Sequence, residues 1–187
     1  MATHPTPPAA PRWRALRTLP WIIAAILLLL PAVAMRLHVE GVDWTTGDFV
    51  VMGAILAVAC GSFDLATRLA PNLAYLLAAA LGIGTSFLLV WANLAVGIIG
   101  DGIHGANLMF FGVIAVAIAG TAVARGRAAG MARAMLATAA ALVLAIGLGL
   151  AEFGASAREA GLTLVFALAW LASAGLFHLS RRGVTRQ

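Results

Sequence analysis

The chain has 187 residues, of which 63% are hydrophobic and only 10% are charged, and its mean hydropathy is +1.01. About a quarter of the residues in soluble globular domains are charged, so this composition excludes a soluble domain and indicates that lipid surrounds most of the chain. The net charge of +5 comes from arginines in short clusters beside apolar runs, a pattern that sets membrane topology, so no nucleic-acid partner is expected.

Six apolar runs, each bounded by charged or turn-forming residues, follow one another along the chain. They cover Leu19–Met35, Asp48–Thr67, Leu73–Val96, Asn107–Ala124, Arg133–Ala151 and Gly161–Leu179. About 20 apolar residues span a bilayer, and a spanning segment must satisfy its own backbone hydrogen bonds. The sequence therefore predicts an all-α fold, a polytopic transmembrane helical bundle of about six spans over residues 19–180.

The segments on either side of this bundle are short. Residues 1–18 begin with MATHPTPPAAP, whose prolines cannot continue a helix, so we expect a disordered cytoplasmic tail there. Residues 181–187 are expected to form an arginine-rich cytoplasmic tail.

The first apolar run has a second interpretation. Arginines precede it and the small-residue sequence PAVA ends it at Ala34, which is the layout of a secretory signal peptide. Cleavage of residues 1–34 would leave five spans, and the sequence leaves both alternatives open. The carboxyl terminus stays on the same side in either case.

Charges divide unequally between the two sides that six alternating spans define. Ten arginines share the side of the termini with a single acid, Asp64, whereas two arginines lie on the other side. That other side carries six acids, which are Glu40, Asp43, Asp48, Asp101, Glu152 and Glu159. Cytoplasmic loops carry excess arginine, so we expect a protein of the bacterial inner membrane with both termini in the cytoplasm.

Sequence spacing also makes predictions about packing. Asp64 and Arg68 stand four residues apart, which suits an ion pair on one helical face. Small residues recur every fourth position in the second span (Gly53, Ala57, Gly61) and the third (Ala78, Gly82, Ser86). Such stripes let helix backbones approach closely, so we expect a compact bundle, with self-association through one stripe as an alternative. Tyr75 and Phe177 are expected at the membrane interface on the arginine-rich side.

The predicted spans offer little chemistry. No ionisable residue falls in the central part of any of them, which disfavours proton coupling and a charged-ring pore. A serine protease built on Ser86 and His178 is disfavoured because the two residues lie at different depths. We therefore do not expect an enzyme.

The stretch WANLAVGIIGDGIHGANLMFFG, between the third and fourth spans, is the richest in polar residues. Its glycines suit a tight turn, and Asn107 can cap the helix that follows. Asp101 and His104 share the predicted outer face with Asp43 and Asp48. These five residues, Asp43, Asp48, Asp101, His104 and Asn107, form the candidate outer-face binding site.

A metal site on this face is a weaker hypothesis. His38, His104 and Asp101 supply imidazole and carboxylate groups that suit zinc or manganese, although their spacing matches no known ligand pattern. Haem ligation by His38 or His104 is less favoured still, because both lie in loops and not in a bundle interior. No cofactor is expected.

The residues WANLAVGIIG and ANLMFFGVIAVAIAG resemble a family of small, uncharacterised bacterial integral membrane proteins. In that family VGIIG leads into a short acidic loop and then NPANLMY; here no proline precedes Ala106, and Phe110 replaces the tyrosine. WTTGDF at Trp44–Phe49 and the residues Gly130–Met135 extend the resemblance loosely over the middle two thirds of the chain. It implies an inner-membrane helical bundle and no assigned activity.

These observations predict an accessory or binding subunit that uses its acidic outer face to meet a ligand or another membrane protein. The alternative is a small-molecule carrier or channel, which requires a polar-lined cavity between spans. A membrane metal-binding protein or enzyme is the third hypothesis.

Overall fold

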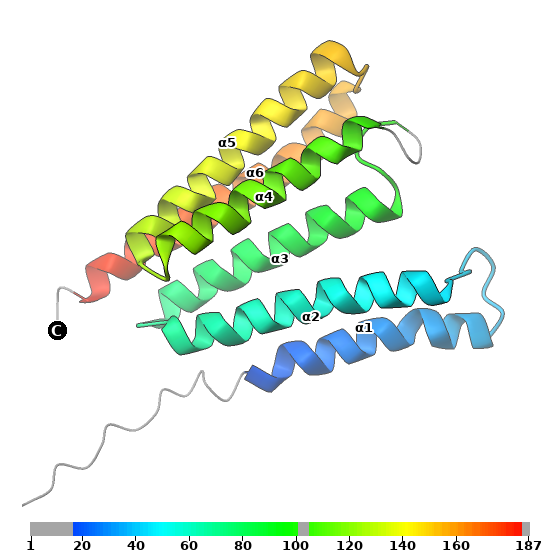
Figure 1. Ribbon diagram of the computed structural model, residues 1–187, viewed down its shortest axis with the longest axis horizontal. Helices are drawn as coiled ribbons and strands as arrows, with labels where there is room; N and C mark the ends of the chain where they lie inside the picture. Colours follow the sequence, from blue (N-terminus) through cyan, green and yellow to red (C-terminus); the bar gives the residue numbers. More distant parts are fainter. Residues whose placement is uncertain (1–16, 101–104, 185–187) are drawn as a thin grey trace, which may run out of the picture.

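The computed structural model describes residues 17–100 and 105–184, and within them every regular element is helical (Figure 1). The helices are α1 (Leu19–Arg36), α2 (Thr46–Leu69), α3 (Leu73–Ala95), α4 (Leu108–Ala124), α5 (Ala128–Glu152) and α6 (Ala157–Val184), and a 3₁₀ turn, η2 (Gly105–Asn107), precedes α4. All six α-helices are long and apolar enough to cross a membrane. The predicted fold class, a polytopic helical bundle of six spans, is confirmed.

The last two helices extend beyond the predicted apolar runs. The helix predicted from Arg133 begins at Ala128, and the one predicted from Gly161 begins at Ala157. Hydropathy marks where lipid touches the chain, whereas a helix continues for as long as its backbone hydrogen bonds do. The residues added at the start of α6 include the charged Arg158 and Glu159, whereas those added to α5, residues 128–132, are alanine, glycine and methionine that lie on the far side of Arg133.

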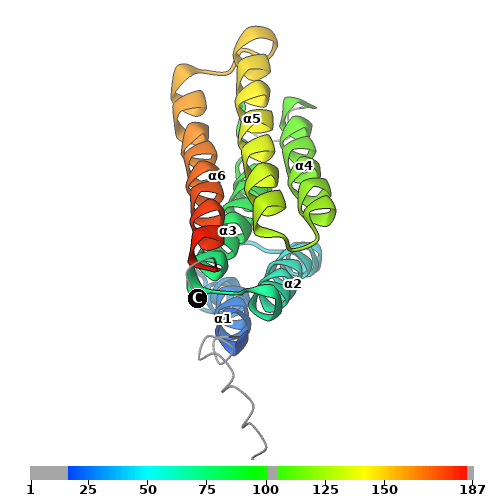
Figure 2. The same ribbon diagram turned by 90° about the vertical axis from the view of Figure 1, so that its left-hand side faces the viewer.

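The six helices fall into a main bundle and an attached hairpin. Helix α5 packs against α4 and α6, and α6 packs against α3. Helix α2 joins this group through α3, and α1 is held mainly by α2. Figure 2 shows α3 between the α4–α5–α6 group and the α1–α2 pair.

The helix connections gather at two opposite ends of the molecule (Figure 1). One end, here called the acidic end, holds the α1–α2, α3–α4 and α5–α6 connections. The other, the arginine-rich end, holds the α2–α3 and α4–α5 connections and the last turn of α6. This alternation places the charge groups predicted from the sequence at opposite ends.

The core of the main bundle is built from large aromatic side chains. Trp170, Tyr75, Phe110 and Phe177 are fully buried, and the rings of Tyr75 and Phe177 meet edge to face at 5.0 Å. Tyr75 and Phe177 do lie towards the arginine-rich end, as expected, but neither side chain is exposed there. Both lie near a helix end but face neighbouring helices, and the Tyr75 hydroxyl donates a hydrogen bond to the Gly126 carbonyl at 2.9 Å.

Two glycines bring α4 and α5 into close contact. A Cβ added at Gly120 would lie 2.8 Å from the Cβ of Ala134, and one added at Gly130 would lie 2.8 Å from the Cα and Cβ of Ala124. Gly120 and Ala124 are four residues apart on α4, as Gly130 and Ala134 are on α5. The two backbones therefore approach through a pair of small-residue stripes.

The small-residue stripes predicted in the second and third spans do not pack against each other. Ala57 and Gly61 are exposed on α2, and a Cβ at Gly61 would meet nothing within 4 Å. On α3, a Cβ at Gly82 would come within 3.0 Å of the Met135 sulfur and 3.2 Å of the Ser173 hydroxyl. The α3 stripe thus packs towards α5 and α6, because those helices and not α2 cover its small face.

Candidate functional site

The predicted outer-face residue Asp48 caps α2 at the acidic end. Its carboxylate accepts hydrogen bonds from the Thr45 backbone N–H at 2.7 Å and the Thr45 hydroxyl at 2.8 Å, and the Asp48 N–H donates to that hydroxyl at 3.3 Å. This reciprocal capping box satisfies backbone donors that a helix start leaves open. Asp48 therefore has a local structural role.

Asn107 is buried and fastens the α3–α4 connection. Its Oδ1 accepts hydrogen bonds from the N–H groups of Ile98 at 3.1 Å and Ile99 at 3.0 Å, and its Nδ2 donates to the Ile99 carbonyl at 3.3 Å. The Asn93 side chain donates to the Asn107 carbonyl at 3.0 Å. Asn107 occupies the predicted N-cap position of α4, but its side chain makes no capping hydrogen bond because it turns back onto the loop.

Glu159 joins two of the connections at the acidic end. Its carboxylate accepts from the Ser156 N–H at 2.6 Å, within its own helix start, and from the Gly100 N–H at 3.0 Å, in the α3–α4 connection. A Cβ at Gly149 would lie 2.7 Å from Ile99 Cδ1, so this glycine makes room for the same loop. The α3–α4 connection is thus held in place by polar bonds and by packing.

The other predicted residues of the acidic end stand apart from these networks. Asp43, Glu40 and His38 are exposed, and His38 has a left-handed backbone with φ of +55°. Asp101 and His104 lie outside the described residues. Within residues 17–100 and 105–184, no three His, Cys, Asp or Glu side chains come together as a metal site would require.

A groove of about 700 Å³ runs along the side of the bundle between α2 and α4. Helix α3 contacts both of these helices and lies between them. Met131 and Met135 of α5 and Phe177 of α6 also line the groove. Val58, Leu65 and Ile118 line the groove and are more than half exposed. The groove therefore opens sideways, onto the surface that faces lipid.

The lining of this groove is almost entirely apolar. Among its hydroxyl groups, Ser86 donates to the Gly82 carbonyl at 2.8 Å, Thr121 donates to the Ile118 carbonyl at 2.9 Å, and Tyr75 donates to Gly126. Hydroxyls within membrane helices commonly bond to the backbone in this way. Three hydroxyl groups of the groove therefore already donate hydrogen bonds to backbone carbonyls. The remaining surface of the groove is suited to contact with a hydrocarbon chain.

One charged residue, Arg125, lines the groove, at its arginine-rich end. Arg125 follows the last residue of α4 with a left-handed φ of +47°, and its side chain is exposed. A left-handed residue commonly ends a helix, and here that residue is an arginine at the edge of the apolar groove. This position could not be predicted from the sequence, because the groove forms only where helices from separate parts of the chain meet.

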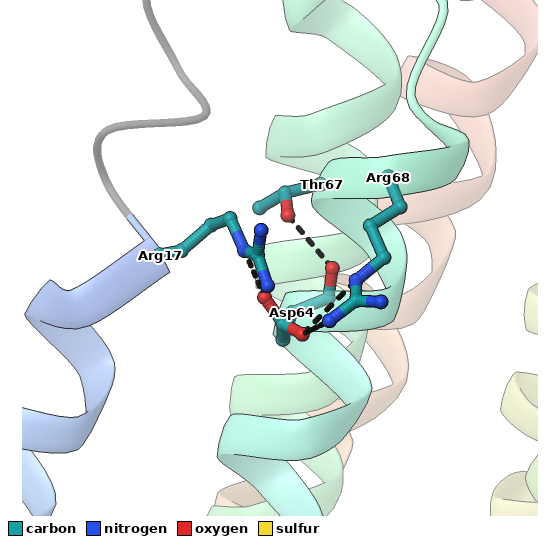
Figure 3. Close-up of polar contacts among 4 residues, drawn as sticks. All are labelled: Arg17, Asp64, Thr67 and Arg68. Atoms are coloured by element: carbon teal, nitrogen blue, oxygen red, sulfur yellow. Dashed lines mark hydrogen bonds and ion pairs between the residues drawn. The ribbon is translucent and has the colours of Figure 1, made fainter.

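A polar cluster at the arginine-rich end centres on Asp64 (Figure 3). The Asp64 carboxylate accepts from Arg68 at 2.6 Å, so the predicted ion pair is confirmed, and it also pairs with Arg17. The Thr67 hydroxyl donates to the Asp64 backbone carbonyl at 2.7 Å. Arg17 precedes α1, so this cluster ties the start of α1 to the end of α2.

Comparison of the chain with protein-family models, with curated proteins and with solved structures gave no match. The resemblance to small bacterial membrane proteins therefore stays a prediction.

Proposed function

We propose that this protein is a non-enzymatic binding protein of the bacterial inner membrane, and that it holds a largely apolar, chain-shaped molecule in the groove between α2 and α4. The observation that carries the proposal is the groove itself. Its volume of about 700 Å³ lies within the range of roughly 300–1,000 Å³ that is typical of ligand sites.

The character of the lining supports this choice over a carrier or channel for polar solutes. A polar solute that enters an apolar site loses its hydrogen bonds to water without replacing them, which costs several kcal/mol. A carrier or channel was expected to show a polar-lined cavity, whereas this groove offers hydrocarbon surface. A lipid-like molecule meets that surface at little cost.

Native mass spectrometry of the protein released from nanodiscs tests the proposal. The wild type should retain one lipid-sized adduct. Ala59→Phe and Ala122→Phe, at two small groove residues on α2 and α4, should lower adduct occupancy by about tenfold, since filling the groove removes the contact surface.

Matched controls lie on the same helices. Ala57 and Ala119 are exposed and lie outside the groove, so Ala57→Phe and Ala119→Phe should retain the adduct. A wild type without any adduct, or equal occupancy in groove and control variants, would refute the proposal.

Binding of another membrane protein at the acidic end is a second proposed function. It is supported by Glu40, Asp43 and Glu152, which are exposed acids at that end. Because Asp48 and Asn107 are engaged in hydrogen bonds within the chain, Asp43, Asp101 and His104 are the residues to substitute. Triple replacement by alanine should preserve folding and weaken co-purification with a partner; undiminished co-purification would refute this function.

A further inference from the structure

We infer that the groove selects an anionic lipid, whose phosphate binds Arg125 at the arginine-rich end while one acyl chain lies along α3 towards Val90. This inference rests on the proposed function of the groove and specifies its ligand. It follows from the position of Arg125, from the lack of an acid paired with it among the described residues, and from the length of the groove.

Arg125 stands where a lipid headgroup would lie. It lines the groove together with its neighbour Gly126 and with Tyr75, which belongs to the first turn of α3. Both α3 and α4 therefore place this part of the groove at a helix terminus, which is the level of the membrane surface in a spanning bundle. A guanidinium at that level keeps its charge in the polar region while its stem covers apolar surface.

In residues 17–100 and 105–184, no carboxylate pairs with Arg125. Asp64 is the one acid that the sequence places on this side of the membrane, and it is engaged by Arg17 and Arg68. Among the described residues, no ion pair joins Arg125 to an acid. A lipid phosphate supplies the missing negative charge, and its oxygens match the two-pronged geometry of a guanidinium.

The length of the groove fits an acyl chain. Along α3 the lining extends from Tyr75 to Val90, or roughly 22 Å of helix at about 1.5 Å per residue. One leaflet contributes about 15 Å of hydrocarbon, half of a core that is about 30 Å thick. A lipid anchored at Arg125 therefore finds apolar groove over the whole depth of its leaflet.

The side chains at the base of the groove suit such a flexible ligand. Met131 and Met135 are unbranched and polarisable, and methionine adapts its shape to irregular partners. Among the residues that the structure describes, no further charged or amide side chain lines the groove. The groove is thus expected to discriminate between lipids by their headgroups and not by their acyl chains.

The test uses the full chain in nanodiscs that contain equal amounts of phosphatidylglycerol and phosphatidylcholine, with the retained lipid identified by native mass spectrometry. The wild type should retain phosphatidylglycerol over phosphatidylcholine by about tenfold. Arg125→Gln should bring this ratio close to one while the total retained lipid persists, because the apolar groove is unchanged.

Arg127→Gln is the matched control, since Arg127 is an exposed arginine of the same connection and does not line the groove. It should keep the wild-type preference. A wild type that retains both lipids equally overturns the anionic selection but leaves the groove function standing, whereas a wild type that retains neither refutes the groove function. Equal effects of Arg125→Gln and Arg127→Gln would overturn the assignment to Arg125 in favour of general surface charge.

Discussion

At the scale of single residues, polar side chains at the acidic end mainly satisfy the backbone. Asp48 caps α2, Asn107 binds three backbone groups of the α3–α4 connection, and Glu159 accepts N–H groups from two different connections. Buried backbone groups need partners, and a loop packed against a membrane bundle has few waters to supply them. Asp48 and Asn107 belong to the predicted binding site, and the structure shows that both, together with Glu159, support the loops through hydrogen bonds.

Asn107→Ala should destabilise the protein. It leaves the N–H groups of Ile98 and Ile99 without their acceptor, at a cost of about 1–3 kcal/mol for each unsatisfied buried group. Thermal unfolding in detergent should show a lower midpoint than the wild type. Asp43→Ala, at an exposed residue of the same end, should leave the midpoint unchanged. An unchanged midpoint for Asn107→Ala would contradict the role of this side chain as a loop fastener.

Among the helices, the α4–α5 pair and the α1–α2 pair are held together by different contacts. Helices α4 and α5 meet through glycine and alanine, so their attraction comes from close contact of the backbones. Helices α1 and α2 form a small cluster around Ala24, Leu56 and Cys60, with the Asp64 cluster at one end. Only the Asp64–Arg68 pair was predictable, because a four-residue spacing needs no knowledge of neighbouring helices.

Gly120→Leu and Gly130→Leu should each separate α4 from α5. A side chain at either position would overlap backbone or Cβ atoms at about 2.8 Å, so the helices must move apart and lose their packing. Loss of the folded peak in size-exclusion chromatography, or a thermal midpoint well below that of the wild type, is the expected result. Gly112→Leu and Gly147→Leu, where a Cβ meets nothing within 4 Å, should behave as the wild type. Equal behaviour of all four variants would show that close packing at Gly120 and Gly130 is unimportant.

Asp64→Asn should loosen α1 from α2. The substitution removes the charge that Arg17 and Arg68 share, and α1 has few other contacts. Cys60, the single cysteine, is buried against α1 and reports the change. A membrane-permeant maleimide should label Cys60 faster in Asp64→Asn than in the wild type. Arg36→Gln, at the other end of α1, should leave the labelling rate of Cys60 unchanged. If Asp64→Asn is labelled no faster than the wild type, the Asp64 cluster does not hold α1 against α2.

At the scale of the whole molecule, the alternating helices separate the charges into an acidic end and an arginine-rich end. The groove opens sideways between them, with its one arginine at the arginine-rich end. The proposed orientation, with both termini in the cytoplasm, would point Arg125 towards the inner leaflet. The orientation of the protein therefore determines from which leaflet the groove would take its lipid.

Reporter fusions test this orientation. Green fluorescent protein fused after Gln187 should fluoresce in bacterial cells, because it folds in the cytoplasm. Alkaline phosphatase inserted at Gly41, in the exposed α1–α2 connection, should be active, because it requires export. The reverse pattern would overturn the proposed topology and would move the Arg125 headgroup site to the outer leaflet.

The amino-acid sequence was enough to predict a helical membrane protein with six spans, unequal charges at its two ends and the Asp64–Arg68 ion pair. Each of these depends on composition or on short spacing along one helix. Three features depend on how the helices pack: the burial of Tyr75 and Phe177, the contact of α4 with α5 through Gly120 and Gly130, and the position of Arg125 beside a groove. Lipid and the interior of the bundle are both apolar, so the lipid-facing and inward-facing sides of a membrane helix carry similar residues. In a soluble protein, by comparison, the buried side of a helix is apolar and the exposed side is polar, and the sequence shows which is which.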